Sequence, residues 1–250
     1  MGLIAGWWAE VRSALYVLVG ACLTYGALLF AVSRMKGENA FTSILTDMES
    51  MTPSMRWLAL VQFCSWFALF AIFVYTAPAV ARMHFGATSP GTPEYEAGAN
   101  WAGVLFGTFY ALAIAAAFVM PYFVRRFGMP LTHRISLWSG AAGLLSMMWI
   151  HEPEWLLVSM TGLGVAWAAI VSLPYAMLAN HLPARKMGVN IGIFNIFIVV
   201  PQLLAASVMA SLLDTLSGGD PAYAFIIAAI GWFLAGLVVT RVSDTAPQEV

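Results

Sequence analysis

Amide and aromatic side chains lie within long apolar runs of the chain, at spacings that could form a binding site. Asn195 and Gln202 are seven residues apart in the run GIFNIFIVVPQ, so in a helix they share one face. Tyr175 lies upstream in the run SLPYAML. Amides hydrogen-bond hydroxyl groups, and aromatic rings stack on the apolar face of a pyranose. The pattern is therefore suited to binding a sugar; the alternative is that the amides hydrogen-bond between helices as packing contacts.

A second polar and aromatic stripe occupies residues 62–73, with spacings of four, four and three that place it on one helical face. Trp167 lies in the middle of another apolar run, where an interfacial aromatic belt does not explain it. The competing interpretation is that these rings pack in the core or contact lipid. The stripe consists of Gln62, Trp66, Phe70 and Phe73, and the full set of candidate substrate-binding residues is Gln62, Trp66, Phe70, Trp167, Tyr175, Asn195 and Gln202.

Proline and glycine residues inside these runs predict helix bends and close helix packing. Pro78, Pro174 and Pro201 each remove a backbone hydrogen bond, so we expect a bend at each. The pairs Gly103–Gly107 and Gly188–Gly192 follow the small-xxx-small pattern that lets membrane helices approach closely.

Two short basic segments separate apolar runs. RRFG contains Arg125, Arg126 and Gly128, and HLPARK contains Arg185 and Lys186. Basic residues beside a turn could clamp helix ends across a closing gate. They could equally anchor the helices at the membrane surface.

The composition indicates which elements must position these residues. Hydrophobic residues make up 61% of the 250 residues and charged residues 9%, whereas soluble domains carry about a quarter charged residues. A membrane-spanning helix needs roughly 20 mostly apolar residues, and open sheet edges are excluded from hydrocarbon. We therefore expect an all-α integral membrane protein. The seven predicted transmembrane helices are 13–33, 57–81, 97–124, 135–150 (extending back to Leu131), 155–184, 187–213 and 221–240.

The loop charges predict an orientation. Nine basic residues fall on one side of the predicted helices, while the other side carries two basic and six acidic residues. The positive-inside rule then places the N-terminus outside and the C-terminus in the cytoplasm, in a multi-pass protein of the cell (inner) membrane. The nine are Arg34, Lys36, Arg56, Arg125, Arg126, Arg134, Arg185, Lys186 and Arg241, and the two on the other side are Arg12 and Arg82.

The predicted helices divide the chain around one polar loop. Residues 1–33 hold the first helix, 34–55 a central cytoplasmic loop, 56–241 six helices, and 242–250 a cytoplasmic tail. Six helices after a central loop suggest one half of a twelve-helix transporter. Residues 1–12 show neither a basic n-region nor a cleavage site that would translocate an N-terminus. We therefore expect the chain to begin partway through a longer protein.

The run SLPYAMLANHLPARKMGVNIGIFNIFIVVPQLLAA resembles the helix 10 to helix 11 region of sucrose/proton symporter-like members of the major facilitator superfamily, in the glycoside–pentoside–hexuronide cation symporter group. The run QFCSWFALFAIFVYTAPAVA resembles the seventh helix of those proteins, and RRFG resembles their basic turn between helices 8 and 9. The resemblance implies helices 6 to 12 of a twelve-helix transporter, with six forming one half-bundle. It also implies proton-coupled sugar symport by alternating access. The partners would be the lipid bilayer, a sugar, a proton and a missing N-terminal half.

Other functions are weakly supported. The net charge of −1 gives no indication of nucleic-acid binding, and Cys22 and Cys64 both lie in apolar runs, so we expect no metal site and no cofactor. The sequence shows no nucleophile–base pair typical of an enzyme. No acidic or basic residue lies near the centre of a predicted helix, where proton couplers usually need one. The alternatives are a seven-helix receptor or sensor and a non-transporting membrane subunit.

Overall fold

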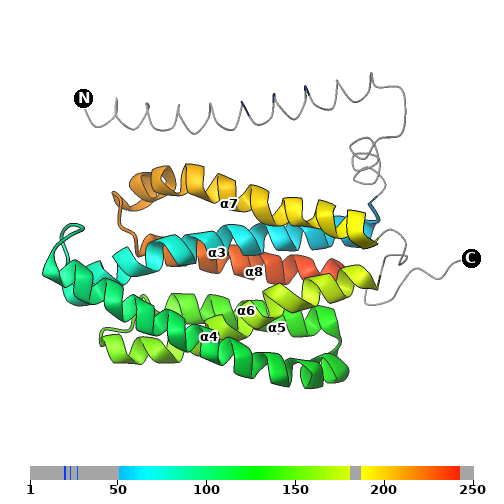
Figure 1. Ribbon diagram of the computed structural model, residues 1–250, viewed down its shortest axis with the longest axis horizontal. Helices are drawn as coiled ribbons and strands as arrows, with labels where there is room; N and C mark the ends of the chain where they lie inside the picture. Colours follow the sequence, from blue (N-terminus) through cyan, green and yellow to red (C-terminus); the bar gives the residue numbers. More distant parts are fainter. Residues whose placement is uncertain (1–19, 21–22, 24–26, 28–50, 181–186, 243–250) are drawn as a thin grey trace, which may run out of the picture.

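The computed structural model describes residues 51–180 and 187–242, together with Gly20, Leu23 and Ala27. These residues form helices and no strand. The first predicted helix (apart from those three positions), most of the loop 34–55, the turn with Arg185 and Lys186, and most of the C-terminal tail lie outside the described residues. The helices are α3 (Pro53–Phe85), α4 (Pro93–Phe127), α5 (Met129–Ser146), α6 (Leu156–Ala179), α7 (Met187–Ser217) and α8 (Tyr223–Val238), with 3₁₀ turns at η1 (Pro153–Trp155) and η3 (Val239–Arg241) (Figure 1).

Two of the helices begin at the same local signal, a threonine followed by a proline. The Thr52 hydroxyl accepts a hydrogen bond from the Met55 amide at 3.4 Å, and the Thr92 hydroxyl accepts one from the Tyr95 amide at 3.3 Å. Each cap satisfies an amide that has no partner inside the helix, and the proline that follows has the right φ and no N–H to leave unpaired. α3 therefore begins at Pro53, three residues before the predicted start of the six-helix half.

All six helices expected after the central loop are present, but their ends differ from the prediction. α4 extends beyond the predicted 97–124 because its terminal turns carry charges, with Glu94 and Glu96 at its start and Arg125 and Arg126 at its end. These charges interact favourably with the helix dipole, so a prediction based on the charge-free stretch alone makes the helix too short. α5 ends at Ser146 rather than at 150, and α6 at Ala179 rather than at 184.

Of the described helices, five are long and apolar enough to cross a membrane. α5 is not among them, and only three positions of the first predicted helix are described, so the predicted count of seven spans is not confirmed. α5 has 18 residues and carries polar groups in its first two turns. Its length of about 27 Å is still close to the roughly 30 Å of the hydrocarbon core.

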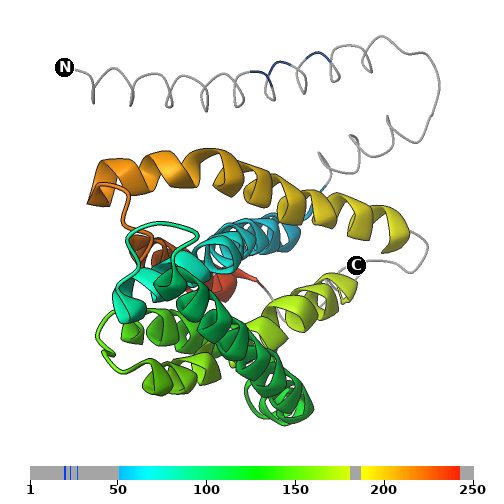
Figure 2. The same ribbon diagram turned by 60° about the vertical axis from the view of Figure 1, so that its left-hand side comes forward.

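The helices form three layers. α7 lies at one side and packs mainly on α3; α3 and α8 form the middle; α4, α5 and α6 form the other side. Both views show this order, with the middle layer between α7 and both α4 and α5, while the end of α6 comes close to α7 (Figures 1 and 2). Among the described helices, α7 therefore has packing partners on only one of its sides.

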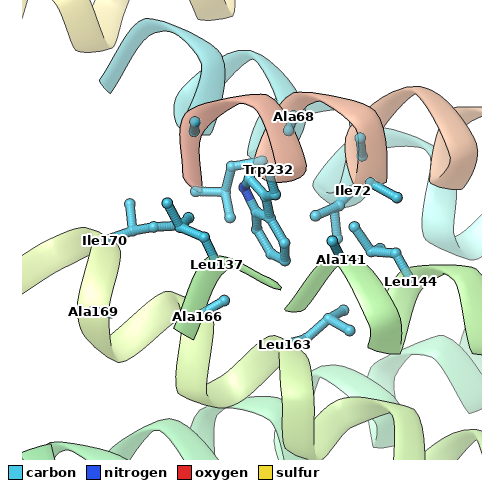
Figure 3. Packing of buried hydrophobic residues seen from close by; sticks show 14 of the residues in the cluster. Ala68, Ile72, Leu137, Ala141, Leu144, Leu163, Ala166, Ala169, Ile170 and Trp232 are labelled. Atoms are coloured by element: carbon cyan, nitrogen blue, oxygen red, sulfur yellow. The ribbon is translucent and has the colours of Figure 1, made fainter. Parts of the chain in front are cut away.

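The core between these layers is centred on Trp232 of α8. Its side chain is fully buried among Ala68 of α3, Leu137 of α5 and Ala166 of α6 (Figure 3). Its indole N–H donates a hydrogen bond to the Ser65 carbonyl oxygen at 3.2 Å, so the polar atom of this large side chain is satisfied. Trp232 thereby connects α3, α5, α6 and α8.

The close helix approaches use glycines other than the predicted pairs. An added Cβ at Gly140 would lie 2.5 Å from the Ala166 Cβ, and one at Gly164 would lie 2.9 Å from the Phe109 carbonyl oxygen. At Gly103, Gly107, Gly188 and Gly192 an added Cβ would meet no atom within 4 Å. The expectation that these four bring helices together is therefore wrong for the described helices, because their faces point away from the described packing partners.

The antiparallel order of the helices brings the basic residues to one end of the bundle. Arg56, Arg125, Arg126, Arg134 and Arg241 lie near the start of α3, the α4–α5 turn and the end of α8. The six acidic residues and Arg82 lie in or beside the turns at the opposite end. The fold thus has a basic end and an acidic end, which are the names used below.

Candidate functional site

Six aromatic side chains from three helices gather into one cluster, here called the aromatic wall. Trp167 is its centre: its ring centroid lies 5.9 Å from Trp66, 5.9 Å from Phe73 and 6.0 Å from Phe109. Most of the ring pairs meet edge to face, the arrangement that ring quadrupoles favour. The wall consists of Trp66 and Phe73 of α3, Phe106, Phe109 and Tyr110 of α4, and Trp167 of α6.

Part of the aromatic wall is buried in the bundle, and part of it is exposed. Phe109 is fully buried, whereas Phe73 is 37% and Tyr110 44% exposed. Trp66 and Trp167 are half-buried. The Trp66 indole N–H is buried and has no hydrogen-bond partner among the described residues. An unpaired buried donor is costly, on the order of 1–3 kcal/mol. The wall therefore offers exposed ring surface, while its one unpaired donor, the Trp66 N–H, is enclosed by the protein.

Local sequence explains why these rings meet. Gly164 lies one turn before Trp167 on α6, and its lack of a side chain lets α6 approach the α4 backbone at Phe109. On α4 the spacing of Phe106, Phe109 and Tyr110 by three and four residues puts their rings on adjacent positions of one face. These three residues were not among the sequence candidates, although the i, i+3, i+4 spacing in LFGTFY was a signal for them.

A polar bridge joins α6 to α7. The Tyr175 hydroxyl donates a hydrogen bond to the Asn195 Oδ1 at 2.8 Å, and the Tyr175 ring meets Phe194 edge to face at 5.6 Å. α7 otherwise packs on α3 and α8 rather than on α6. Asn195 is exposed and Tyr175 half-buried, and the Asn195 amide nitrogen remains as a donor. Two residues proposed from sequence are thus brought into direct contact.

The bridge lies beside the wall, nearer the basic end. Tyr175 follows Trp167 by eight residues, which is about 12 Å along α6, and it precedes the last residue of the helix by four. Gln202 lies about 10 Å beyond Asn195 on the same face of α7. Its Nε2 donates to the Ile198 carbonyl oxygen at 3.0 Å, and the side chain is half-buried. Gln202 is therefore bonded to its own helix and has one amide oxygen for another partner.

Two sequence candidates lie apart from these groups. Gln62 is fully buried, and neither its Oε1 nor its Nε2 has a partner among the described residues. Phe70 is half-buried and takes no part in the ring contacts of the wall. The stripe predicted for residues 62–73 is thus divided, because only Trp66 and Phe73 join Trp167.

The prolines predicted to bend helices lie inside helices, and the predicted basic turn lies at the end of α4. Pro78, Pro174 and Pro201 lie inside α3, α6 and α7, each of which continues past its proline. Arg125 and Arg126 are exposed in the last turn of α4. Gly128 ends that helix with a φ of 78°, a conformation that favours glycine. The gating role predicted for this turn stays a prediction, and Arg185 and Lys186 lie outside the described residues.

Within the described residues no group of three or more His, Cys, Asp and Glu could hold a metal ion. The arrangement is instead one of rings, amides and hydroxyls on membrane-length helices. The profile of the Major Facilitator Superfamily matches residues 1–206. The chain belongs to the Major Facilitator Superfamily. It is an integral membrane protein with several membrane-crossing helices.

Among proteins of known name, the chain is similar to two sucrose transport proteins of plants. It is 40% identical over 84 residues to sucrose transport protein SUT2 of Oryza sativa subsp. indica, covering 33% of this chain and 17% of that protein. It is 30% identical over 95 residues to sucrose transport protein SUC4 of Arabidopsis thaliana, covering 35% of this chain and 18% of that protein. The chain thus aligns with less than a fifth of the length of either relative. No solved structure matches it.

Proposed function

We propose that this chain is the C-terminal half of a transporter for a sugar or glycoside, with the aromatic wall and the Tyr175–Asn195 bridge as its contribution to the substrate site. The observation that carries the proposal is the open ring surface of the wall beside the hydrogen-bonding groups of Tyr175 and Asn195. The superfamily membership and the similarity to sucrose transport proteins support it.

The chemistry of the wall suits a pyranose. The exposed parts of Phe73 and Tyr110 and the half-buried Trp167 can cover the apolar C–H face of a sugar ring. The exposed Asn195 amide can both donate to and accept from sugar hydroxyls.

The bridge can couple binding to movement. Tyr175 and Asn195 hold α6 and α7 together near the basic end, and Pro174 and Pro201 stand in the same two helices, where they weaken the backbone hydrogen-bond ladder. Breaking one hydrogen bond, worth about 0.5–1.5 kcal/mol, would let the helix ends separate. We propose that this bridge closes the basic end in one state of an alternating-access cycle.

Two further proposals concern the source of the proton-coupling group and the surface that a partner half approaches. Within the described helices every acidic and basic residue lies within two turns of a helix end, whereas proton carriers in membranes are ionisable groups inside the bundle. We propose that the coupling group is contributed by an N-terminal half. The unpartnered faces of α4 and α7 at Gly103, Gly107 and Gly188 offer a surface where that half can approach closely.

We further propose that the basic end faces the cytoplasm of a cell (inner) membrane. The five described arginines at that end, against Arg82 at the other, follow the positive-inside rule. Cysteine accessibility checks this: a single cysteine placed at exposed Arg126 should react with a membrane-impermeant maleimide only in inside-out vesicles. A single cysteine at exposed Glu94 should react only in right-side-out vesicles.

Uptake by proteoliposomes tests the transport function. We expect radiolabelled sucrose to accumulate when the chain is reconstituted with the first five helices of a sucrose transport protein and a pH gradient is imposed. Collapsing the gradient with a protonophore should abolish accumulation. If the reconstituted pair takes up no disaccharide with or without the gradient, the proposed function is wrong.

Matched tryptophan variants connect that assay to the wall. Trp167→Ala removes the central ring, and we expect at least about ten-fold slower uptake, the equivalent of 1.4 kcal/mol. Trp149→Ala removes an exposed ring at the acidic end and should leave uptake unchanged. Sucrose that raises the thermal stability of the chain without any uptake would instead indicate a non-transporting binding subunit.

A further inference from the structure

An apolar groove of about 330 Å³ runs between α4, α5 and α6, on a part of the surface separate from the aromatic wall. α4 lines it with Leu112, Ala115, Ala116, Val119, Met120 and Phe123, α5 with Thr132, Ile135 and Ser136, and α6 with Thr161 and Val165. The Thr132 and Ser136 hydroxyls donate to the Gly128 and Thr132 carbonyl oxygens of their own helix. Because these hydroxyls are bonded to their own helix, the lining of the groove is mainly apolar.

The groove has the depth of one membrane leaflet. Its α4 lining extends from Leu112 to Phe123, which is about 16 Å along the helix and half of the roughly 30 Å hydrocarbon core. Phe123 lies one turn before the end of α4, and Thr132 lies in the first turn of α5, so the groove opens at the basic end. From there it reaches to about the middle of the membrane.

Positive charge stands at this opening. Arg126 follows Val119 by seven residues and Phe123 by three, so it continues the groove face of α4, whereas Arg125 points to the other side of the helix. The amino end of α5 lies directly after Gly128 and has no side-chain cap. Pro130 has no N–H and the Thr132 N–H is bonded to the Gly128 carbonyl oxygen, so the Met129 and Leu131 N–H groups are the donors of this first turn that can face an anion. Within the described residues no ion pair neutralises Arg126.

We propose that the groove binds one acyl chain of an anionic phospholipid, whose phosphate is held by Arg126 and the amino end of α5. The apolar length takes the chain to the bilayer centre, and the charge at the opening selects the headgroup. A second copy of this protein or a helix of another protein could also cover an apolar groove, but neither would account for the cationic opening at leaflet-headgroup depth.

Native mass spectrometry of the full chain in detergent tests this, with dioleoyl phosphatidylglycerol and dioleoyl phosphatidylcholine as probes. We expect phosphatidylglycerol to bind more tightly. Arg126→Gln should lower that preference about five-fold, the contribution of one basic residue near an anionic headgroup. Arg125→Gln, in the same helical turn but off the groove face, should lower it much less.

A second pair of variants addresses the acyl chain. Ala115→Leu fills the groove and should weaken both lipids about ten-fold, as expected if the added side chain displaces roughly two methylene groups. Ala117→Leu lies two residues away on the opposite, exposed face of α4 and should have no effect. Because both are alanine-to-leucine changes on one helix, a general effect on folding or on the micelle would affect them alike.

Three outcomes would overturn the proposal. Ala115→Leu and Ala117→Leu could bind the lipids equally, which would remove the groove from the interaction. Glycerol-3-phosphate could compete with phosphatidylglycerol as strongly as the lipid itself, which would make the site one for a free phosphate. A dimer in the mass spectrum that Ala115→Leu dissociates would assign the groove to a second copy of the chain.

Discussion

Adding a single methyl group at Gly140 should destabilise the protein. Gly140 of α5 faces both Ala166 of α6 and the buried ring of Trp232. A Cβ in that position would lie 2.5 Å from the Ala166 Cβ and 2.5 Å from the Trp232 Cζ3. Neither neighbour is the free end of a flexible side chain. Gly140→Ala therefore requires α5 to move away from α6 and α8.

The expected cost follows from two opposing effects. Overpacking a well-packed core costs about 1–3 kcal/mol, while replacing a helical glycine by alanine recovers roughly 0.5–1 kcal/mol. We expect Gly140→Ala to lower the free energy of unfolding by about 1–2 kcal/mol. Gly107→Ala is the matched control, because an added Cβ on this exposed α4 position meets no atom within 4 Å. It should be neutral or stabilising by up to about 1 kcal/mol.

The assay is reversible unfolding in mixed micelles, with dodecyl sulfate as denaturant and circular dichroism as the signal. Trp232→Phe supplies the second arm of a double-mutant cycle, because phenylalanine lacks the fused ring that carries Cζ3. The cost of Gly140→Ala should then fall by about 1 kcal/mol in the Trp232→Phe background. Equal costs in both backgrounds, or equal effects of Gly140→Ala and Gly107→Ala, would refute the packing described for this site.

Three further predictions use the same unfolding assay. A double-mutant cycle of Tyr175→Phe and Asn195→Ala should give a coupling of about 0.5–1.5 kcal/mol from their 2.8 Å hydrogen bond; strictly additive effects would show that the bridge does not form. A cycle of Ser146→Ala and Ser159→Ala, whose hydroxyls lie 2.7 Å apart, should give about 0.6 kcal/mol, the average for membrane helices, and a value of zero would contradict the contact. Gln62→Leu removes two buried unpaired polar atoms and should stabilise the protein by about 1–3 kcal/mol, whereas destabilisation would show that Gln62 has a partner.

Local sequence was sufficient to predict the described helices, because a membrane leaves the backbone no alternative to internal hydrogen bonding. It was less reliable at helix ends. The α4 charges Glu94, Glu96, Arg125 and Arg126 lie within the helix, whereas charge-free windows placed them outside it. The glycine pairs were misjudged for a related reason. A small-xxx-small pattern identifies a face that can be approached closely, but not whether another helix covers that face.

The substrate-binding role of the candidate residues stays a prediction. Seven-residue spacing placed Asn195 and Gln202 on one face of α7, and the structure adds a hydrogen bond from Tyr175 to Asn195 that the sequence did not predict. Sequence did not reveal that Phe106, Phe109 and Tyr110 complete the wall around Trp167, because their role depends on α4 packing against α6 through Gly164. It also grouped Gln62 and Phe70 with Trp66, although of these three residues only Trp66 contacts the ring of Trp167.

By itself, the sequence determined the membrane environment, the helices and the accumulation of basic residues in one set of loops. Each of these depends on local hydrophobicity, on caps such as Thr52 and Thr92, and on the charge of short segments. Only the tertiary structure decided which rings meet, which glycines allow contact, and which polar atoms lack a partner. Those properties depend on the rotation and spacing of helices far apart in the chain, and packing around residues such as Trp232 sets both.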